Sequence, residues 1–181
     1  MKDKIIGVDI GGTKISAGLI SNNIIVNKVT IDTEPNESKA HIIQNVFIAI
    51  DKVWQQEVRG IGVGVPGLVD PENGIVYQLQ NISSWQEVTL KEHLQLRYNV
   101  PTFINNDANC FALGEKYFGI GQKHRNFVGV TLGTGVGTGI IIDNKLYSGC
   151  FSGAGEFGSI SYKESSFEKY CSGQFLKDIM V

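Results

Sequence analysis

The stretch IGVDIG at residues 6–11 returns at residues 128–133 as VGVTLG. The offset between the two copies is 122 positions, and it is unchanged where LISN at 19–22 matches IIDN at 141–144. Each copy is a short apolar run followed by glycine, which is the pattern of a buried strand that turns into a second strand. One repeat at this spacing indicates two similar domains, each beginning with a glycine-turned hairpin.

The sequence between the two copies predicts further elements. The segments 4–10, 15–20 and 24–31 predict three antiparallel strands. Apolar residues from Ile42 to Trp54 recur at steps of three and four, which predicts an amphipathic helix. The remaining elements that we expect are strands at 60–65 and 102–104 and a helix from 107 to about 117.

The repeat also predicts domain boundaries. We expect a first domain over residues 1–118 and the first part of a second domain over 119–181. Far fewer residues follow the second hairpin than follow the first, so we expect the second domain to be incomplete and this chain alone to have little activity.

Composition and charge exclude several classes of function. The net charge is −2 and the basic residues form no run, which argues against nucleic acid as the main partner. No apolar stretch approaches the roughly 18 residues of a membrane span, and no signal peptide is visible, so we expect a cytoplasmic protein. The three cysteines never form a Cys-x-x-Cys pair, and the three histidines lack metal-ligand spacing.

Two glycine-rich turns are candidates for binding an anion. Gly11–Lys14 lies between two expected strands, where backbone N–H groups and the Lys14 ammonium can face a phosphate. A plain β-turn explains that tetrapeptide about equally well. Alternating glycines over Gly133–Gly139 would weaken a strand pair unless another group approaches the backbone closely. Two such hairpins related by duplication suggest a nucleotide phosphate tail as the ligand.

Two other nucleotide-binding motifs do not apply. The stretch GVGVPG at 62–67 matches G-x-G-x-x-G, but it contains a proline and no convincing helix follows it. A Walker A motif needs Gly-Lys followed by Ser or Thr, which neither glycine-rich hairpin supplies. The sequence therefore predicts neither a Rossmann nor a P-loop site.

Two acidic residues are candidates for chemistry. Asp107 follows two asparagines at an expected helix start, where it is either a helix-capping acid or a general base for phosphoryl transfer. Glu156 stands among the glycines of 153–158, either as a ligand contact or as a solvated loop acid. The residues themselves leave both pairs of alternatives open.

Five motifs in order resemble the ROK family, which comprises bacterial repressors, open reading frames and sugar kinases. They are DIGGTK at 9–14, GVPGLVD at 64–70, NDAN at 106–109, GTGVG at 133–137 and GAGEFG at 153–158. The resemblance covers residues 4 to about 175. It implies an α/β fold of the actin-like, ribonuclease-H-like duplicated type, and an ATP-dependent kinase that uses Mg²⁺ and acts on a hexose-type sugar.

The resemblance also implies roles for the matching residues. Those that would hold the phosphates of ATP are Gly11, Gly12, Thr13, Lys14, Gly133, Thr134, Gly135 and Gly137, with Asp9 near Mg²⁺. Those that would line the sugar site are Gly67, Asn81, Asn106, Asp107 and Glu156, with Asp107 as the catalytic base. Closure of two domains around the substrates is the expected mechanism.

Three departures from the family pattern concern the sugar site and a structural metal. Ser159 stands where the family has histidine after Gly158. Cys171 is the only thiol in the region of the family's cysteine cluster, so we expect no structural zinc. We also find no glutamate after that region to serve as the family's last sugar contact.

Two other functions compete with a sugar kinase. One is a ROK-type transcriptional regulator that binds sugar without phosphorylating it. The family's regulators carry a helix-turn-helix before the first hairpin, whereas this chain begins its first strand at about Lys4, which favours the enzyme. The other is a non-catalytic sugar-binding protein, which Ser159 favours and Asp107 opposes. A homodimer and the identity of the sugar stay open.

Overall fold

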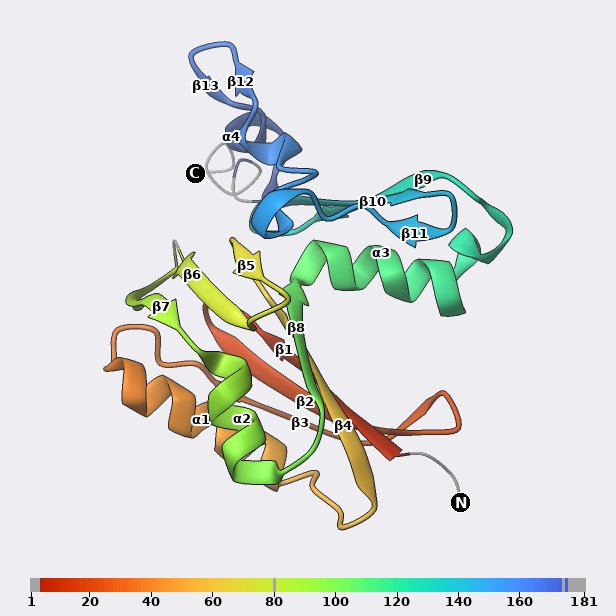
Figure 1. Ribbon diagram of the computed structural model, residues 1–181. Helices are drawn as coiled ribbons and strands as arrows, with labels where there is room; N and C mark the ends of the chain where they lie inside the picture. Colours follow the sequence, from red (N-terminus) through yellow and green to blue (C-terminus); the bar gives the residue numbers. More distant parts are fainter. Residues whose placement is uncertain (1–3, 80, 174, 176–181) are drawn as a thin grey trace. The chain divides into compact units, whose positions relative to one another are not determined.

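The computed structural model describes residues 4–79, 81–173 and 175, and its contacts divide the chain into two compact units (Figure 1). The first unit is Met1–Asn106 and the second is Asp107–Val181. Helix α3 (Asp107–Phe118) groups with the second unit by contacts, whereas the sequence placed it in the first domain. Contacts alone do not test the domain boundary expected from the repeat, which stays a prediction.

The first unit is built on a five-stranded sheet with the order β3-β2-β1-β4-β8. β1, β2 and β3 form the expected antiparallel meander, and β4 and β8 run parallel to β1. The bounds of these strands are β1 Lys4–Ile10, β2 Lys14–Ser21, β3 Ile24–Asp32, β4 Val58–Val65 and β8 Thr102–Asn106.

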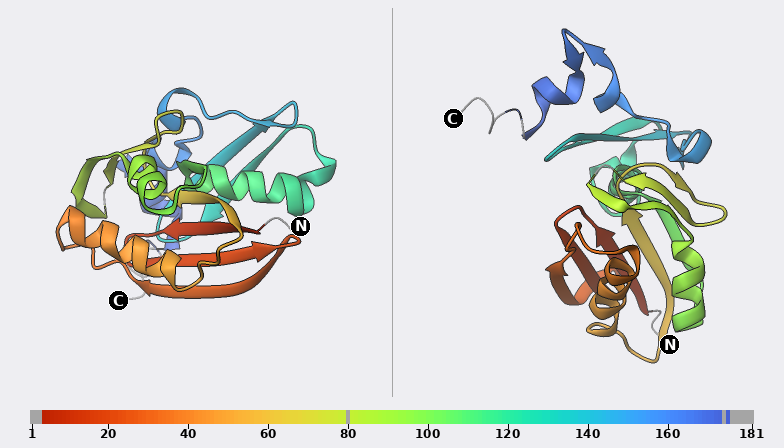
Figure 2. Two further views of the ribbon diagram at one scale, coloured as in Figure 1. Left: turned by 60° about the horizontal axis from the view of Figure 1, so that its bottom comes forward. Right: turned by 90° about the vertical axis from the view of Figure 1, so that its left-hand side faces the viewer.

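Two helices cover one face of this sheet (Figures 1 and 2). They are α1 (Lys39–Asp51) and α2 (Leu90–Tyr98). Ile6, Val8 and Ile10 of β1 are buried beneath them, because alternate residues of a strand point to the same face. The expected helix stops before Trp54, whose ring instead lies 4.7 Å from that of Tyr98.

A small antiparallel sheet follows β4, and we did not expect it from the sequence. It consists of β5 (Val69–Asp70), β6 (Ile75–Leu79) and β7 (Ile82–Val88). The buried positions of β7 are Ile82, Trp85 and Val88, at steps of three. The alternation of apolar and polar residues that marks a half-buried strand is therefore missing.

The second unit joins helix α3 to the repeated hairpin. α3 packs on β9 and β10, and a Cβ at Gly139 would lie 2.6 Å from the carbonyl oxygen of Ala108. The elements of this unit after α3 are η1 Ile120–Lys123, β9 Phe127–Leu132, β10 Val136–Ile142, β11 Lys145–Leu146, η2 Cys150–Ser152, η3 Phe157–Ser159, β12 Ser161–Tyr162, β13 Ser165–Ser166 and α4 Phe167–Cys171.

The two hairpins repeat each other in structure, but the constant offset of the sequence alignment was wrong. β1 and β2 close at the pair Ile10↔Ile15, whereas β9 and β10 close at Leu132↔Val136. The second tip is therefore one residue shorter. The turns after the second strands, 22–23 and 143–144, both have positive φ and are offset by 121. The sequence did not reveal this one-residue difference, because Ile20 matches an isoleucine at an offset of 121 (Ile141) and also at an offset of 122 (Ile142).

Among the described residues, no helix is long and apolar enough to cross a membrane.

Candidate active site

The Gly11–Lys14 turn joins β1 to β2 at the carboxyl end of β1. Gly11 closes the turn by donating its N–H to the carbonyl oxygen of Lys14 at 2.8 Å. Within the described part of the chain, no backbone hydrogen bond uses the N–H of Gly12 or Thr13. These donors and the exposed Lys14 suit an anion, because successive backbone N–H groups in a turn form an anion-binding concavity.

Asp9 lies beside this turn, one residue before the end of β1. It is in register with Gly64 of β4, and Gly64 is in register with Asn105 of β8. All three residues therefore lie at the carboxyl edge of the parallel strands, where open α/β sheets bind their ligands. Asp9 and Asn105 lie on either side of Gly64, which has no side chain, so one carboxylate and one side-chain amide belong to the same edge of the sheet. Such oxygen donors suit Mg²⁺.

Three residues that the sequence assigns to sugar binding belong to the first unit. Gly67 has φ of 81°, a left-handed conformation that favours glycine, and its carbonyl oxygen accepts a hydrogen bond from Asn106 Nδ2 at 3.1 Å. Asn106 is buried and ends β8, while Asn81 is exposed. A Cβ placed on Gly12 would lie 2.6 Å from the Cβ of Asn81, so Asn81 lies against the Gly11–Lys14 turn.

Asp107 begins the second unit, at the first residue of α3. Its side chain is exposed, and its Oδ1 accepts the N–H of Ala108 at 2.8 Å. The carboxylate therefore has one oxygen turned toward the helix backbone. The peptide bond to Asn106 links it directly to the strand that ends at the carboxyl edge of the sheet.

The second glycine-rich turn, residues 133–135, is closed differently from the first. Gly133 donates to the carbonyl oxygen of Gly135 at 3.0 Å, and Gly173 donates to that of Gly133 at 2.7 Å. Val136, the first residue of β10, donates its N–H to Glu168 Oε2 at 2.8 Å, so a carboxylate lies directly beside this turn. The phosphate roles of Gly133, Thr134 and Gly135 stay predictions.

Two of the alternating glycines have a structural explanation within the second unit. A Cβ on Gly137 would lie 3.0 Å from the Cβ of Ala108, and one on Gly139 would lie 2.6 Å from the Cβ of Ala112. Helix α3 thus approaches the backbone at both positions, and at Gly137 the Thr131 hydroxyl of β9 lies nearer still, at 2.6 Å from the added Cβ. A phosphate contact from Gly137 stays a prediction.

Glu156 lies at the start of the η3 turn. Glu156 is exposed by its accessible surface, but its pKa is raised above the ordinary value, mainly because neighbouring protein atoms reduce the hydration of its carboxylate, and further by the charges of Asp107 and Glu168. Two carboxylates of this unit therefore lie close enough to Glu156 to oppose its ionisation.

Glu168 is the residue of this group that the sequence analysis missed. It lies in α4, before the region in which we expected a further glutamate. Its carboxylate lies beside Gly135 and Gly158, where it would meet a Cβ added to either glycine. The sequence around it gave no distinct signal, because Glu168 lies in a charged stretch with Glu164 and Lys169.

The segment after Ser159 is held by aromatic side chains. Tyr170 lies 5.6 Å from Tyr162 and 6.1 Å from Phe175 between ring centroids, and Lys163 lies over Tyr170 at 5.1 Å. Cys171 is exposed. In the described part of the chain no three His, Cys, Asp or Glu side chains are grouped to hold a metal ion. The absence of structural zinc stays a prediction.

The family model of the ROK family matches residues 5–174, which include every candidate residue above. The chain belongs to the ROK family. It shares 43% identity over 150 residues with a glucokinase of Thermotoga maritima, covering 82% of this chain and 47% of the relative. It shares 38% identity over 164 residues with a xylose repressor of Caldicellulosiruptor bescii, covering 85% of this chain and 40% of the relative.

Solved structures of the ROK family have the same fold. A ROK family glucokinase from Streptomyces griseus, solved in complex with glucose and AMPPNP, matches with a TM-score of 0.86 at 37% identity. The match covers 96% of this chain and 58% of that chain. The α/β fold is therefore the actin-like fold of ROK proteins, as expected. The chain spans about half the length of the curated relatives it matches.

Proposed function

We propose that the full-length ROK protein transfers the γ-phosphoryl group of ATP to a hydroxyl group of a hexose-type sugar. The observation that carries this proposal is the contact between Gly12 and Asn81. It brings a turn with unused N–H donors and a polar amide side chain together at the carboxyl edge of one sheet. Phosphoryl transfer needs such an arrangement, because catalysis depends mainly on positioning the phosphate against the hydroxyl.

The proposed roles follow the chemistry of each side chain. Asp107 accepts the proton of the attacking hydroxyl, and Asn106, fixed by its bond to Gly67, orients the sugar. Glu156 and Asn81 provide further partners for the sugar hydroxyl groups. The carboxylate oxygens of Glu156 can accept hydrogen bonds from the hydroxyl groups of a sugar.

Asp9 is the residue that would hold Mg²⁺, with Asn105 at the same sheet edge. When bound, Mg²⁺ neutralises charge on the phosphate oxygens. Lys14 and the N–H groups of Gly12 and Thr13 bind and orient the phosphates in this proposal. Thr134 and Gly135 of the second turn are proposed to contact the same phosphates.

A sugar-responsive regulator is the second candidate function, and the 38% identity to a xylose repressor favours it. A non-catalytic sugar-binding protein is a related alternative, since it and the regulator would both bind sugar without phosphorylating it. The similarity to the glucokinases and the presence of Asp107 together favour the enzyme. A cytoplasmic location, the absence of a nucleic-acid partner and a homodimer stay predictions.

The experiment measures ADP release by the full-length protein, with ATP, Mg²⁺ and a panel of hexoses and N-acetylhexosamines. The kinase proposal expects release that depends on one or a few sugars. Sugar binding measured calorimetrically without any sugar-dependent ADP release would support the regulator and overturn the enzyme. Replacing ATP with AMPPNP provides the control for binding without transfer.

A further inference from the structure

Thr33, which lies outside the Gly11–Lys14 turn, donates two hydrogen bonds to it. The Thr33 hydroxyl donates to the carbonyl oxygen of Gly11 at 2.8 Å, and its N–H donates to that of Thr13 at 2.9 Å. Together with the bond from Gly11 to Lys14, these contacts occupy the carbonyl oxygens of three of the four turn residues. Thr33 is completely buried although it is polar, and it lies directly after β3.

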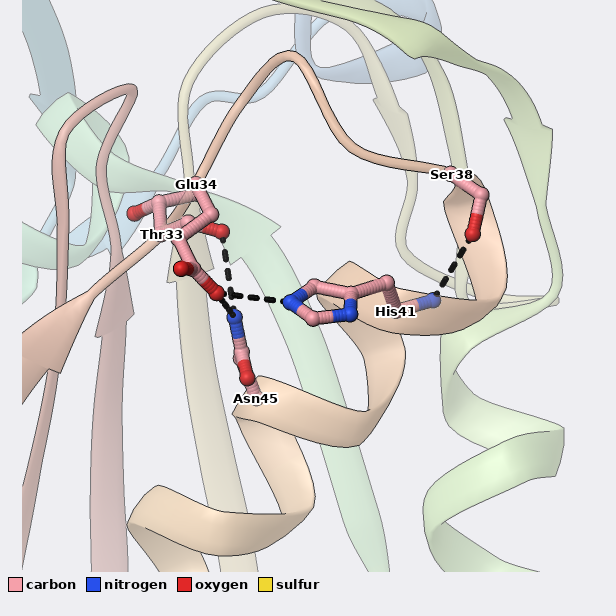
Figure 3. Close-up of polar contacts among 5 residues, drawn as sticks. All are labelled: Thr33, Glu34, Ser38, His41 and Asn45. Carbon is pink, nitrogen blue, oxygen red and sulfur yellow. Dashed lines mark hydrogen bonds and ion pairs between the residues drawn. The ribbon is translucent and has the colours of Figure 1, made fainter.

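Thr33 is in turn held from helix α1. Asn45 Nδ2 donates to the carbonyl oxygen of Thr33 at 3.4 Å and to Glu34 Oε2 at 3.0 Å (Figure 3). Asn45 is itself buried, so this amide is fixed by its surroundings. His41 Nε2 lies 2.6 Å from the same Glu34 oxygen, and Ser38 caps the helix by accepting the His41 N–H at 3.3 Å.

The backbone of Glu34 supports the same interpretation. Its φ is 56°, a left-handed conformation that a residue with a side chain adopts only when surrounding contacts hold it there. His41 and Asn45 provide those contacts. This conformation sets the direction in which the chain leaves Thr33.

We propose that Thr33 is a positioning residue that holds the Gly11–Lys14 turn with its carbonyl groups turned inward, leaving the N–H groups of Gly12 and Thr13 for the phosphates of ATP. Asn45 and the Glu34–His41 pair hold Thr33 in that position. The inference rests on the proposed function, because it assigns the turn an ATP phosphate as its ligand. It adds a requirement that lies outside the turn itself and 22 residues from Gly11 in the chain.

The test compares Thr33→Val with Thr33→Ser in the full-length protein. Valine keeps the shape but removes the hydroxyl donor, and serine restores it. Because one buried hydrogen bond is lost, KM for ATP should rise about 3- to 10-fold in Thr33→Val. KM for the sugar should stay within about twofold, and Thr33→Ser should recover most of the ATP affinity. Asn45→Leu should change KM for ATP in the same direction, which keeps the test informative should Thr33→Val not fold.

Thr102→Val is the matched control. Thr102 is also buried and also donates its hydroxyl to a backbone carbonyl, that of Val100 at 3.2 Å, but at the opposite end of the parallel strands. Its KM for ATP should match that of the parent protein. An equal rise in Thr102→Val, an unchanged KM in Thr33→Val, or no recovery in Thr33→Ser would each overturn the inference.

A second readout separates this inference from the proposed function. Amide hydrogen exchange at positions 11 and 33, whose N–H groups are hydrogen-bonded to Lys14 and Thr13, should be faster in Thr33→Val, with exchange in α2 unchanged. If the parent protein transferred no phosphate, the proposed kinase would fail, and equilibrium binding of MgATP together with amide exchange would still test Thr33. Unchanged exchange and unchanged MgATP binding in Thr33→Val would overturn the inference whatever the activity.

Discussion

Asn81 lies so close to Gly12 that a Cβ on the glycine would be 2.6 Å from the Cβ of the asparagine. Atoms at that distance overlap, so any side chain at position 12 must displace Asn81 or the turn. The first unit thus couples its candidate phosphate turn to a candidate sugar contact through van der Waals packing.

Gly12→Ala tests this coupling. We expect kcat/KM for the sugar to fall by about 10- to 100-fold in the full-length protein, because a displacement near 1 Å is costly in an active site. Gly62→Ala is the control, because a Cβ on Gly62 would meet nothing within 4 Å. Steady-state kinetics give kcat/KM for the sugar in both variants, and the comparison tests whether the contact between Gly12 and Asn81 affects catalysis. Equal behaviour of the two would show that the Gly12 contact has no role in catalysis.

Glu168→Gln should lower the pKa of Glu156. The negative charge of Glu168 is one of the causes that raise this pKa, after reduced hydration and the charge of Asp107. A raised carboxyl pKa means that stability is fully present below the ordinary value of 4.5 and falls as pH rises through the folded-state pKa. The variant should therefore lose less stability over that range. An NMR titration of Glu156 gives the pKa directly, and an unchanged value would contradict the proximity of the two carboxylates.

The Glu34–His41 pair should stabilise the protein more at about pH 5.5 than at about pH 8.5. The pKa of His41 is raised above 6.5, first by its hydrogen bond to Glu34 and further by the charges of Glu34 and Glu37. Its contribution is therefore complete below about pH 6.5 and lost as pH rises through the raised pKa. The pKa of Glu34 is lowered, so Glu34 stays ionised throughout this range.

Thermal midpoints of the parent protein and Glu34→Gln measure this effect. The midpoint difference should be small, because the pair is exposed, and it should shrink further at high salt. A difference of the same size at both pH values would exclude the ion pair as its source.

The segment after Ser159 should be stable without zinc. Tyr170→Ala removes ring contacts to Tyr162 and Phe175, each of a kind worth about 0.5–1.5 kcal/mol. We expect limited proteolysis to cut this segment faster in Tyr170→Ala and to be unaffected by a zinc chelator. Tyr117→Ala is the control, because Tyr117 is exposed and pairs with Phe118 on helix α3. One zinc per chain in elemental analysis, or cleavage induced by the chelator, would contradict this prediction.

Several parts of the fold were predictable because their signals are local. The meander, helix α1 and the repeated hairpin follow from apolar periodicity and glycine turns within short windows. The local pattern also placed Asp107 at a helix start, as the structure has it, whereas β8 continues to Asn106 beyond the expected strand at 102–104. Neighbouring residues determine these features.

Other parts depend on contacts between distant residues and carry no such signal. Thr33 looks like an ordinary loop residue in sequence, and its bond to Gly11 appears only when β3 pairs with β2. Glu168 reaches Val136 across 32 residues. The β7 strand was missed because its buried residues are spaced by three. The shorter turn between β9 and β10 was missed because isoleucines align at an offset of 121 and also at 122.

The most direct test of the proposed kinase is the turnover of Asp107→Ala in the full-length protein, measured together with its thermal midpoint. A general base contributes about 10²- to 10⁴-fold, so kcat should fall by that factor while sugar affinity falls less. Were Asp107 only a first-turn helix acid, the variant would lose about 1 kcal/mol of stability and keep its turnover. A lowered midpoint with a normal kcat would contradict the catalytic assignment.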